Sequence, residues 1–311
     1  MNKELFALKK ELLDKRDDLA FVIGNGLNNY AYYPDTSCKW DKLIFKAWNE
    51  VTGSTINSIN GMSLTEFYNL LEIKTALPDK ELKPKVLDSL EHLKPMKFHE
   101  EFGDYLVEWD VPVLTTNYDS NIEFDLFNRH IVKHPKYPNK AMSAHYPWDR
   151  YYGPEGKTNP RVGFGVWHIN GMFDFRQSIK LSLTEYINQS VHARKFIHAG
   201  NEPYDDFENK NQEYWPGYNT WLHIVFNCSL CIFGLSLDRD ETFLRWLLIE
   251  RKKYFMKYPD RAKEGWFIYT SKKDMEENPG QKIFLNEVGF KTVFADSYDS
   301  LYKDFIKYNK H

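Results

Sequence analysis

Leu19-Ala-Phe-Val-Ile-Gly-Asn-Gly26 is the stretch of this 311-residue chain that decides the fold. Its five apolar residues predict a short buried strand, and the glycines that follow predict a tight turn. A strand that runs into such a turn is also a place where the phosphate of a nucleotide can approach the backbone. The stretch therefore predicts the opening strand and turn of an α/β sheet.

The remaining sequence continues the alternation of strands and helices. Further strands are predicted at 111–114, 162–169, 228–233, 266–270 and 291–295. Helices are predicted at 3–18, 40–51, 63–72, 79–93, 97–109, after Asp119 to Phe127, 183–197, 215–226, 239–256, 280–287 and from Tyr298 onward. This order favours an α/β fold with a doubly wound, Rossmann-like parallel sheet.

One domain is expected over residues 1–311. The segment 130–162 is rich in proline and glycine and predicts irregular structure. A second loop begins at Gly200. We therefore expect an inserted lid or smaller helical and loop subdomain within residues 130–215.

Composition limits the classes of protein to consider. Charged residues make up 27% of the chain and the formal net charge is -3, so nothing indicates a nucleic-acid surface. No apolar run approaches the roughly 20 residues of a membrane span. The charged, amphipathic start does not resemble a signal peptide. We expect a soluble, cytoplasmic protein that does not bind membranes.

The metal-binding residue types do not form a convincing site. Cys228 and Cys231 have CxxC spacing, but no second CxxC completes a zinc site. With Cys38 they are an odd count that suits a reducing compartment, and we expect the pair to be buried core cysteines. His130 and His134 have helical spacing, but Pro135 disfavours a helix there. No metal, and no zinc in particular, is expected.

Four segments carry polar groups at the ends of predicted strands. Gly24-Asn25-Gly26 and Gly234-Leu235-Ser236 each follow an apolar run, and each is either a structural turn or a phosphate contact. In Thr115-Thr116-Asn117-Tyr118-Asp119, the side chains of Asn117 and Asp119 would point to the same side of an extended strand end, although either residue could instead begin a helix. The ordinary pKa of a histidine side chain suits a general base at neutral pH. His168 is therefore either such a base or a structural histidine.

Taken in order, these segments resemble the sirtuin superfamily, and most closely its bacterial sirtuin-like NAD hydrolases associated with antiphage defence. Gly24-Asn-Gly-Leu-Asn28 stands where sirtuins carry GAGxS, and Thr115-Thr-Asn-Tyr-Asp119 stands for their TQNxD. His168 takes the place of their catalytic histidine, and Gly234-Leu-Ser236 takes that of their GTS loop. Trp40-Asp-Lys-Leu43 resembles the W-x-x-L of the same branch. The likeness spans about residues 19 to 300.

Several positions depart from the deacetylase sirtuins. Their four zinc cysteines are absent, Asn28 replaces the serine of GAGxS, and Thr116 replaces the glutamine of TQNxD. These departures concern recognition of acyl-lysine more than recognition of NAD.

The resemblance implies an NAD glycohydrolase that releases nicotinamide and ADP-ribose, with NAD as substrate and no further cofactor. Asn117 would hold the ribose or position the water, His168 would act as general base, and Asp119 would bind the carboxamide of nicotinamide. The proposed NAD contacts are Gly24, Asn25, Gly26, Asn28, Thr116, Gly234, Leu235 and Ser236.

Two other functions remain open: a sirtuin-type protein deacylase, and a non-catalytic sensor of NAD or ADP-ribose. The resemblance also implies regulation, because unrestrained hydrolysis of NAD would kill the host. We expect a homo-oligomer, or a separately encoded partner such as an ATPase, an Argonaute-like protein or a phage protein.

Overall fold

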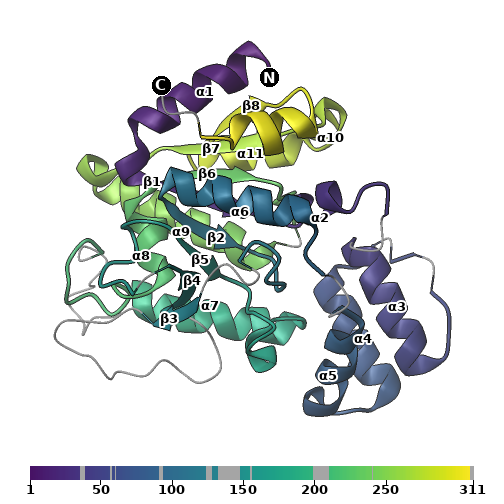
Figure 1. Cartoon of the computed structure of the whole chain (residues 1–311). Helices are drawn as coiled ribbons and strands as arrows, with labels where there is room; N and C mark the ends of the chain where they lie inside the picture. The colour runs from purple at the N-terminus through teal and green to yellow at the C-terminus, as the bar shows by residue number, and fades with distance from the viewer. Residues whose placement is uncertain are drawn as a thin grey trace.

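The computed structural model describes residues 1–35, 39–56, 58–59, 61–90, 94–123, 128–131, 148–154, 156–198, 210–239 and 241–308. These residues contain an eight-stranded sheet with the order β3-β4-β5-β2-β1-β6-β7-β8 (Figure 1). The strands are β1 (Leu19–Ile23), β2 (Pro112–Thr115), β3 (Asn128–Ile131), β4 (Arg150–Gly153), β5 (Gly165–His168), β6 (Ser229–Phe233), β7 (Gly265–Tyr269) and β8 (Lys291–Phe294).

Six of the strands are parallel and follow the Rossmann order. From β1 the chain moves outward to β2 and β5, then returns to the other side of β1 with β6 and continues to β7 and β8. The order therefore reverses between β1 and β6, which is where sheets of this kind open a ligand crevice. The predicted α/β fold with a mostly parallel, Rossmann-like sheet is confirmed.

Helices cover both faces of the sheet. They are α1 (Lys3–Asp14), α2 (Gly26–Ala31), α3 (Trp40–Thr52), α4 (Leu64–Thr75), α5 (Asp79–Leu90), α6 (Lys97–Trp109), α7 (Leu183–Ile197), α8 (Trp221–Asn227), α9 (Thr242–Lys257), α10 (Lys272–Glu277) and α11 (Pro279–Glu287). Short 3-10 turns lie at Arg16–Asp18, Arg176–Ser178 and Pro259–Arg261, and a π-helical turn spans Ser300–Phe305.

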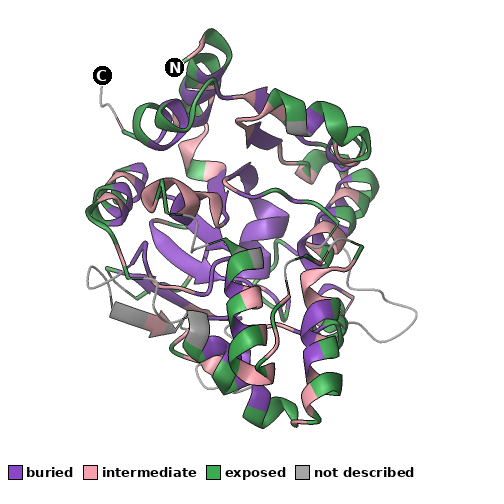
Figure 2. Cartoon of the chain, turned by 90° about the vertical axis from the view of Figure 1, so that its right-hand side faces the viewer, coloured by how far each residue is buried: buried purple, intermediate pink, exposed green. Residues whose placement is uncertain are grey.

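Strand β1 is buried along its whole length because both of its faces are covered. Figure 2 shows the central strands of the sheet in purple, the colour of buried residues. Phe21 and Ile23 point into a core shared with α1 and α6. Ala20 and Val22 alternate with them and point into a core shared with α7, α8 and α9. Burial on two faces explains why this strand is a continuous apolar run rather than an alternating one.

Helices α3, α4 and α5 form a three-helix unit that the chain inserts between β1 and β2 (Figure 1). Its own small core includes Tyr68, Leu71 and Leu82. A partly buried ion pair between Lys83 of α5 and Glu185 of α7 joins this unit to the body of the molecule. A further small core, separate from the two that cover the sheet, therefore lies here, before β2.

The region 130–162 contains strands that the sequence analysis did not predict. Strand β4 pairs antiparallel with both β3 and β5, so this edge of the sheet departs from the parallel arrangement. Prolines on either side of β4 favoured a loop, but buried Tyr151 and Tyr152 supply the aromatic packing that sustains a short strand.

Two other predictions fall partly outside the described residues. A helix was predicted from Asp119 to Phe127, but 121–123 form a turn and 124–127 lie outside the description. Of the predicted lid, 132–147 and 199–209 also lie outside it, while β4, β5 and α7 in the same range belong to the sheet and its cover. The lid stays a prediction.

In the ranges described above, no helix has both the length and the apolar character needed to cross a membrane. Cys228 and Cys231 are free and buried, as predicted. Burial raises the pKa of the Cys228 thiol to about 11, so this thiol is protonated at neutral pH and behaves as a small apolar side chain. Cys38 lies outside the described residues.

The turns that leave β1 and β6 touch through their backbones. The N–H of Gly26 donates to the carbonyl of Gly234 at 2.7 Å, and the N–H of Gly24 donates to that of Phe233 at 3.3 Å. A Cβ on Gly24 would lie 2.6 Å from the Gly234 oxygen, and one on Gly26 would lie 2.7 Å from the Gly234 Cα. Contact between the two turns therefore requires these glycines, whatever else they bind.

We expect Gly24→Ala to lower the free energy of unfolding by about 1–3 kcal/mol, because the added Cβ meets a backbone oxygen that cannot move aside. The matched control is Gly280→Ala in α11, where a Cβ meets no heavy atom within 4 Å. That control should be neutral or slightly stabilising. Urea unfolding followed by circular dichroism measures both, and equal midpoints for Gly24→Ala and the wild type would contradict the packing argument.

Candidate active site

The four motif segments meet at one edge of the sheet. Ile23, Thr115, His168 and Phe233 end their strands in one continuous register across β5, β2, β1 and β6. Because these strands are parallel, the residues that follow all emerge at the same edge. The structure thus brings together the segments that the sequence analysis singled out.

Asn117 is buried beneath this edge, with only 2% of the residue exposed. Its backbone N–H donates to Oγ1 of Thr115 at 3.1 Å, and its Nδ2 donates to the carbonyl of Gly24 at 3.5 Å. Its Oδ1 has no hydrogen-bond partner in the described part of the chain. An unpaired buried acceptor costs about 1–3 kcal/mol, so a site for an incoming donor is the simplest reason to keep it.

His168 is fully buried, and both of its ring nitrogens are engaged. Nδ1 donates to the carbonyl of Asn117 at 2.7 Å, and Nε2 donates to Oε1 of Glu123 at 2.5 Å. Two acceptors at the two nitrogens describe an imidazolium ion paired with a carboxylate. Burial lowers the pKa of His168, but the Glu123 carboxylate and the Asn117 carbonyl more than offset this, so the pKa lies above its ordinary value.

The two hydrogen bonds of His168 oppose a direct role as general base in this conformation. A base needs a nitrogen without a proton that faces the substrate. His168, with a proton on each ring nitrogen, meets this need only after one nitrogen loses its proton and turns from its present acceptor to the substrate, so the role stays a prediction. The hydrogen bond from Nδ1 of His168 to the carbonyl of Asn117 holds the main chain of Asn117 in place.

Asp119 lies two residues beyond Asn117 and is half-buried. Its Oδ2 accepts from Nδ2 of Asn28 at 2.8 Å, and its Oδ1 accepts from the N–H of Asn121 at 3.2 Å. Burial raises the pKa of Asp119, although these two hydrogen bonds oppose the rise. Asn28 itself is fully buried and points into the protein.

The predicted phosphate-contact residues lie in different environments. Asn25 is half-buried, and its Oδ1 accepts from Asn28. Leu235 is buried, whereas Ser236 is exposed and donates to Oδ2 of Asp238 at 3.1 Å. The β6 turn therefore presents a hydroxyl outward, while its glycine packs inward against β1.

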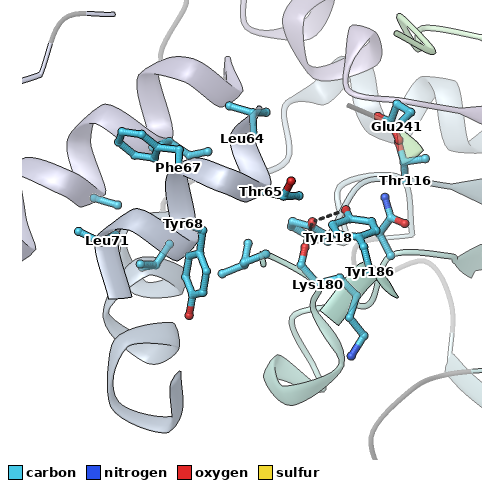
Figure 3. A pocket seen from close by; sticks show the side chains of 15 residues that line it. Leu64, Thr65, Phe67, Tyr68, Leu71, Thr116, Tyr118, Lys180, Tyr186 and Glu241 are labelled. Carbon is cyan, nitrogen blue, oxygen red and sulfur yellow. Dashed lines mark hydrogen bonds between the residues drawn. The ribbon is translucent and has the colours of Figure 1, made fainter. Parts of the chain in front are cut away.

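A pocket opens between the three-helix unit and the ends of β2 and β5 (Figure 3). Leu64, Phe67 and Tyr68 line one side. Polar residues that include Thr116 and Tyr118 line the other, as Figure 3 shows. The full lining is Ile44, Ala47, Leu64, Thr65, Phe67, Tyr68, Leu71, Val86, Thr116, Tyr118, Asn170, Lys180, Leu181, Tyr186 and Glu241.

Two polar side chains in this pocket are open to a ligand. Thr116 and Asn170 are 7% and 5% exposed, and neither side chain has a hydrogen-bond partner within the described ranges. A mostly apolar wall with a few convergent polar groups is typical of sites for small molecules. Thr116 was predicted as a binding residue, whereas Asn170 was not.

Asn170 could have been found from the sequence, because it follows the end of a predicted strand as Asn117 does. Glu123, the partner of His168, gave no such signal. It is an ordinary acidic residue of a turn, and only the fold shows that it is buried beside the histidine that ends β5.

The site offers amide, hydroxyl and carboxylate groups at the end of a buried sheet. Among the residues that the structure describes, His, Cys, Asp and Glu do not gather in a group of three or more that could hold a metal ion. No protein-family model and no curated protein matches this chain. We therefore infer the function from the geometry of these groups and from the order of the motifs.

We expect the His168–Glu123 pair to make stability depend on pH. The folded pKa of His168 is raised, so its contribution is complete below the unfolded value of about 6.5 and is lost as pH rises through the folded value. Near pH 6, His168→Gln should lower the free energy of unfolding by about 3–5 kcal/mol, because Glu123 loses its buried partner.

The measurement is urea unfolding at several pH values between 6 and 9. The gap between wild type and His168→Gln should shrink as pH rises. Glu123→Gln removes the carboxylate that raises the pKa and should flatten this dependence in an otherwise native His168 protein. A gap that widens with pH would show that the pair is not an ion pair.

Proposed function

We propose that this chain is an NAD glycohydrolase that cleaves the bond between nicotinamide and ribose. The observation that carries the proposal is the buried, unpartnered Oδ1 of Asn117 beside the β1 turn. It lies at the carboxyl edge of a Rossmann-like sheet, where such sheets bind nucleotides. The order of the four sirtuin-like segments supports NAD as the nucleotide.

Cleavage of this bond develops positive charge on the ribose, as other glycosidic cleavages do. In the proposed reaction, Oδ1 of Asn117 accepts a hydrogen bond from a ribose hydroxyl or from the attacking water. The carboxylate of Asp119 accepts from the carboxamide of nicotinamide and orients the leaving group. Thr116 and Asn170 supply further polar contacts in the pocket, and its apolar wall limits access of bulk water.

The diphosphate is proposed to lie along the turns of β1 and β6. Gly24, Asn25, Gly26, Gly234, Leu235 and Ser236 remain its proposed contacts. Asn28 takes a different part in the proposal, because its side chain turns inward to Asp119 and supports that residue. His168 holds the Asn117 backbone. A direct role as base would require loss of a ring proton as well as release of that nitrogen from its present acceptor.

A second candidate is a sensor that binds NAD or ADP-ribose without turnover. The engaged ring nitrogens of His168 favour it, because no other histidine was predicted to serve as base. Regulation through homo-oligomerisation or a separately encoded partner belongs to either candidate.

Incubation of the purified chain with NAD, followed by chromatography of nicotinamide and ADP-ribose, tests the proposal. We expect Asn117→Ala to lower turnover by about 10²–10³-fold, the usual effect of losing one group that stabilises the transition state. Asn286→Ala, at an exposed position on α11, is the matched control and should retain full activity.

The outcomes separate the candidates. Turnover that is lost in Asn117→Ala supports the hydrolase. Saturable stabilisation of the wild type by NAD without turnover supports the sensor. A wild-type chain that neither binds nor cleaves NAD would contradict both the hydrolase and the sensor.

A further inference from the structure

Asn28 uses every hydrogen-bonding position of its side chain. Its Nδ2 donates to Oδ1 of Asn25 and to Oδ2 of Asp119, each at 2.8 Å. Its Oδ1 accepts from Nε2 of His99 at 3.0 Å and from Nδ2 of Asn121 at 3.2 Å. Two donors and two acceptances fill the capacity of a carboxamide, so its orientation is fixed by its neighbours.

The imidazole ring of His99 is held in one orientation by a second hydrogen bond, which does not involve Asn28. Its Nδ1 accepts from the N–H of Met96 at 2.9 Å, in the first turn of α6. Burial lowers the pKa of His99 to about 4, so the ring is neutral at pH 7. With Nδ1 as acceptor, the single ring proton lies on Nε2 and points at Asn28.

We propose that His99 is a positioning residue that acts through Asn28 to orient the carboxylate of Asp119. The chain of contacts runs from the start of α6 to the half-buried carboxylate at the candidate site. If the Nε2–H of His99 were lost, Asn28 could rotate its amide and withdraw the donor that holds Oδ2 of Asp119. The kinetic consequence of this inference rests on the proposed NAD glycohydrolase activity.

The same region ties the site to the three-helix unit. The hydroxyl of Tyr32 donates to the carbonyl of Lys94, in the segment that returns from α5 to α6. Nδ2 of Asn121 donates to that hydroxyl at 3.4 Å. His99 therefore lies where the inserted helices rejoin the sheet, and a shift of that segment reaches Asp119 through Asn28.

Two substitutions separate this role from helix capping. The amide of asparagine overlaps the Nδ1 position of histidine, so His99→Asn keeps an acceptor for Met96 but loses the donor to Asn28. The amide of glutamine reaches the Nε2 position, so His99→Gln keeps the donor to Asn28 and loses the cap. Capping alone predicts that His99→Gln is the damaged variant, whereas positioning predicts that it is His99→Asn.

The first readout is the pKa of Asp119, measured by carbon NMR titration of the full chain labelled at aspartate carboxyls and assigned with Asp119→Asn. The hydrogen bond from Asn28 lowers the pKa of Asp119, so its loss in His99→Asn should shift the titration to higher pH. His99→Gln should titrate like the wild type. An unchanged titration in a folded His99→Asn protein would overturn the inference, with or without any activity on NAD.

The second readout is NAD cleavage. His99→Asn should lower kcat by about ten- to a hundredfold, because small displacements of a positioned group have effects of this size. It should also move the acidic limit of the pH profile to higher pH, because the pKa of Asp119 rises when the hydrogen bond from Asn28 is lost. His99→Gln should restore both. If His99→Asn does not fold, Asn28→Ala breaks the same chain of contacts and should shift the Asp119 titration in the same direction; no shift there would overturn the inference.

A wild-type protein without NAD cleavage would contradict the proposed function only. The Asp119 titration would then decide the inference by itself.

Discussion

Direct backbone contact between the turns of β1 and β6 is the constraint on which the arrangement of the site depends. Gly26 donates to Gly234, and a Cβ on Gly24 or Gly26 would collide with the backbone of Gly234. The chain therefore fills the space between the two turns at the switch point. The open polar groups lie on the other side of β1, at Thr116 and Asn170 beneath the three-helix unit. This is why we propose that the reactive end of the ligand lies towards β2 and β5.

Polar interactions at this edge are concentrated in a few buried groups. The His168–Glu123 pair places opposite charges side by side under the Asn117 backbone, where each offsets the cost of burying the other. The burial of the Asn28 side chain is offset by hydrogen bonds instead of by charge, because all of its donor and acceptor positions are filled. Oε2 of Glu123 and Oδ1 of Asn117 are both left without a hydrogen-bond partner in the described part of the chain. The Asn117 oxygen lies beside the β1 turn, and we propose that it receives an external partner.

Much of the sheet could be predicted from the sequence, because strands such as β1 and β6 are apolar runs that end in glycine. Strand β4 could not, since its stability comes from buried aromatic packing between distant segments. The site shows the same division. Asn117 and Asp119 follow a strand and were found from that position, whereas Glu123 and His99 are ordinary in sequence. Only tertiary contact makes those two residues important.

The central position of β1 has a consequence for synthesis of the protein. Phe21 pairs with Val113 on one side and with Cys231 on the other. Strand β1 is therefore synthesised first, and both of its partner strands are translated much later. At about 5–20 residues per second, the second partner follows after roughly ten to forty seconds. During that time at least one edge of this apolar strand has no partner, which is the kind of segment that aggregates. The pairing of β1 is therefore complete only after β6 has left the ribosome.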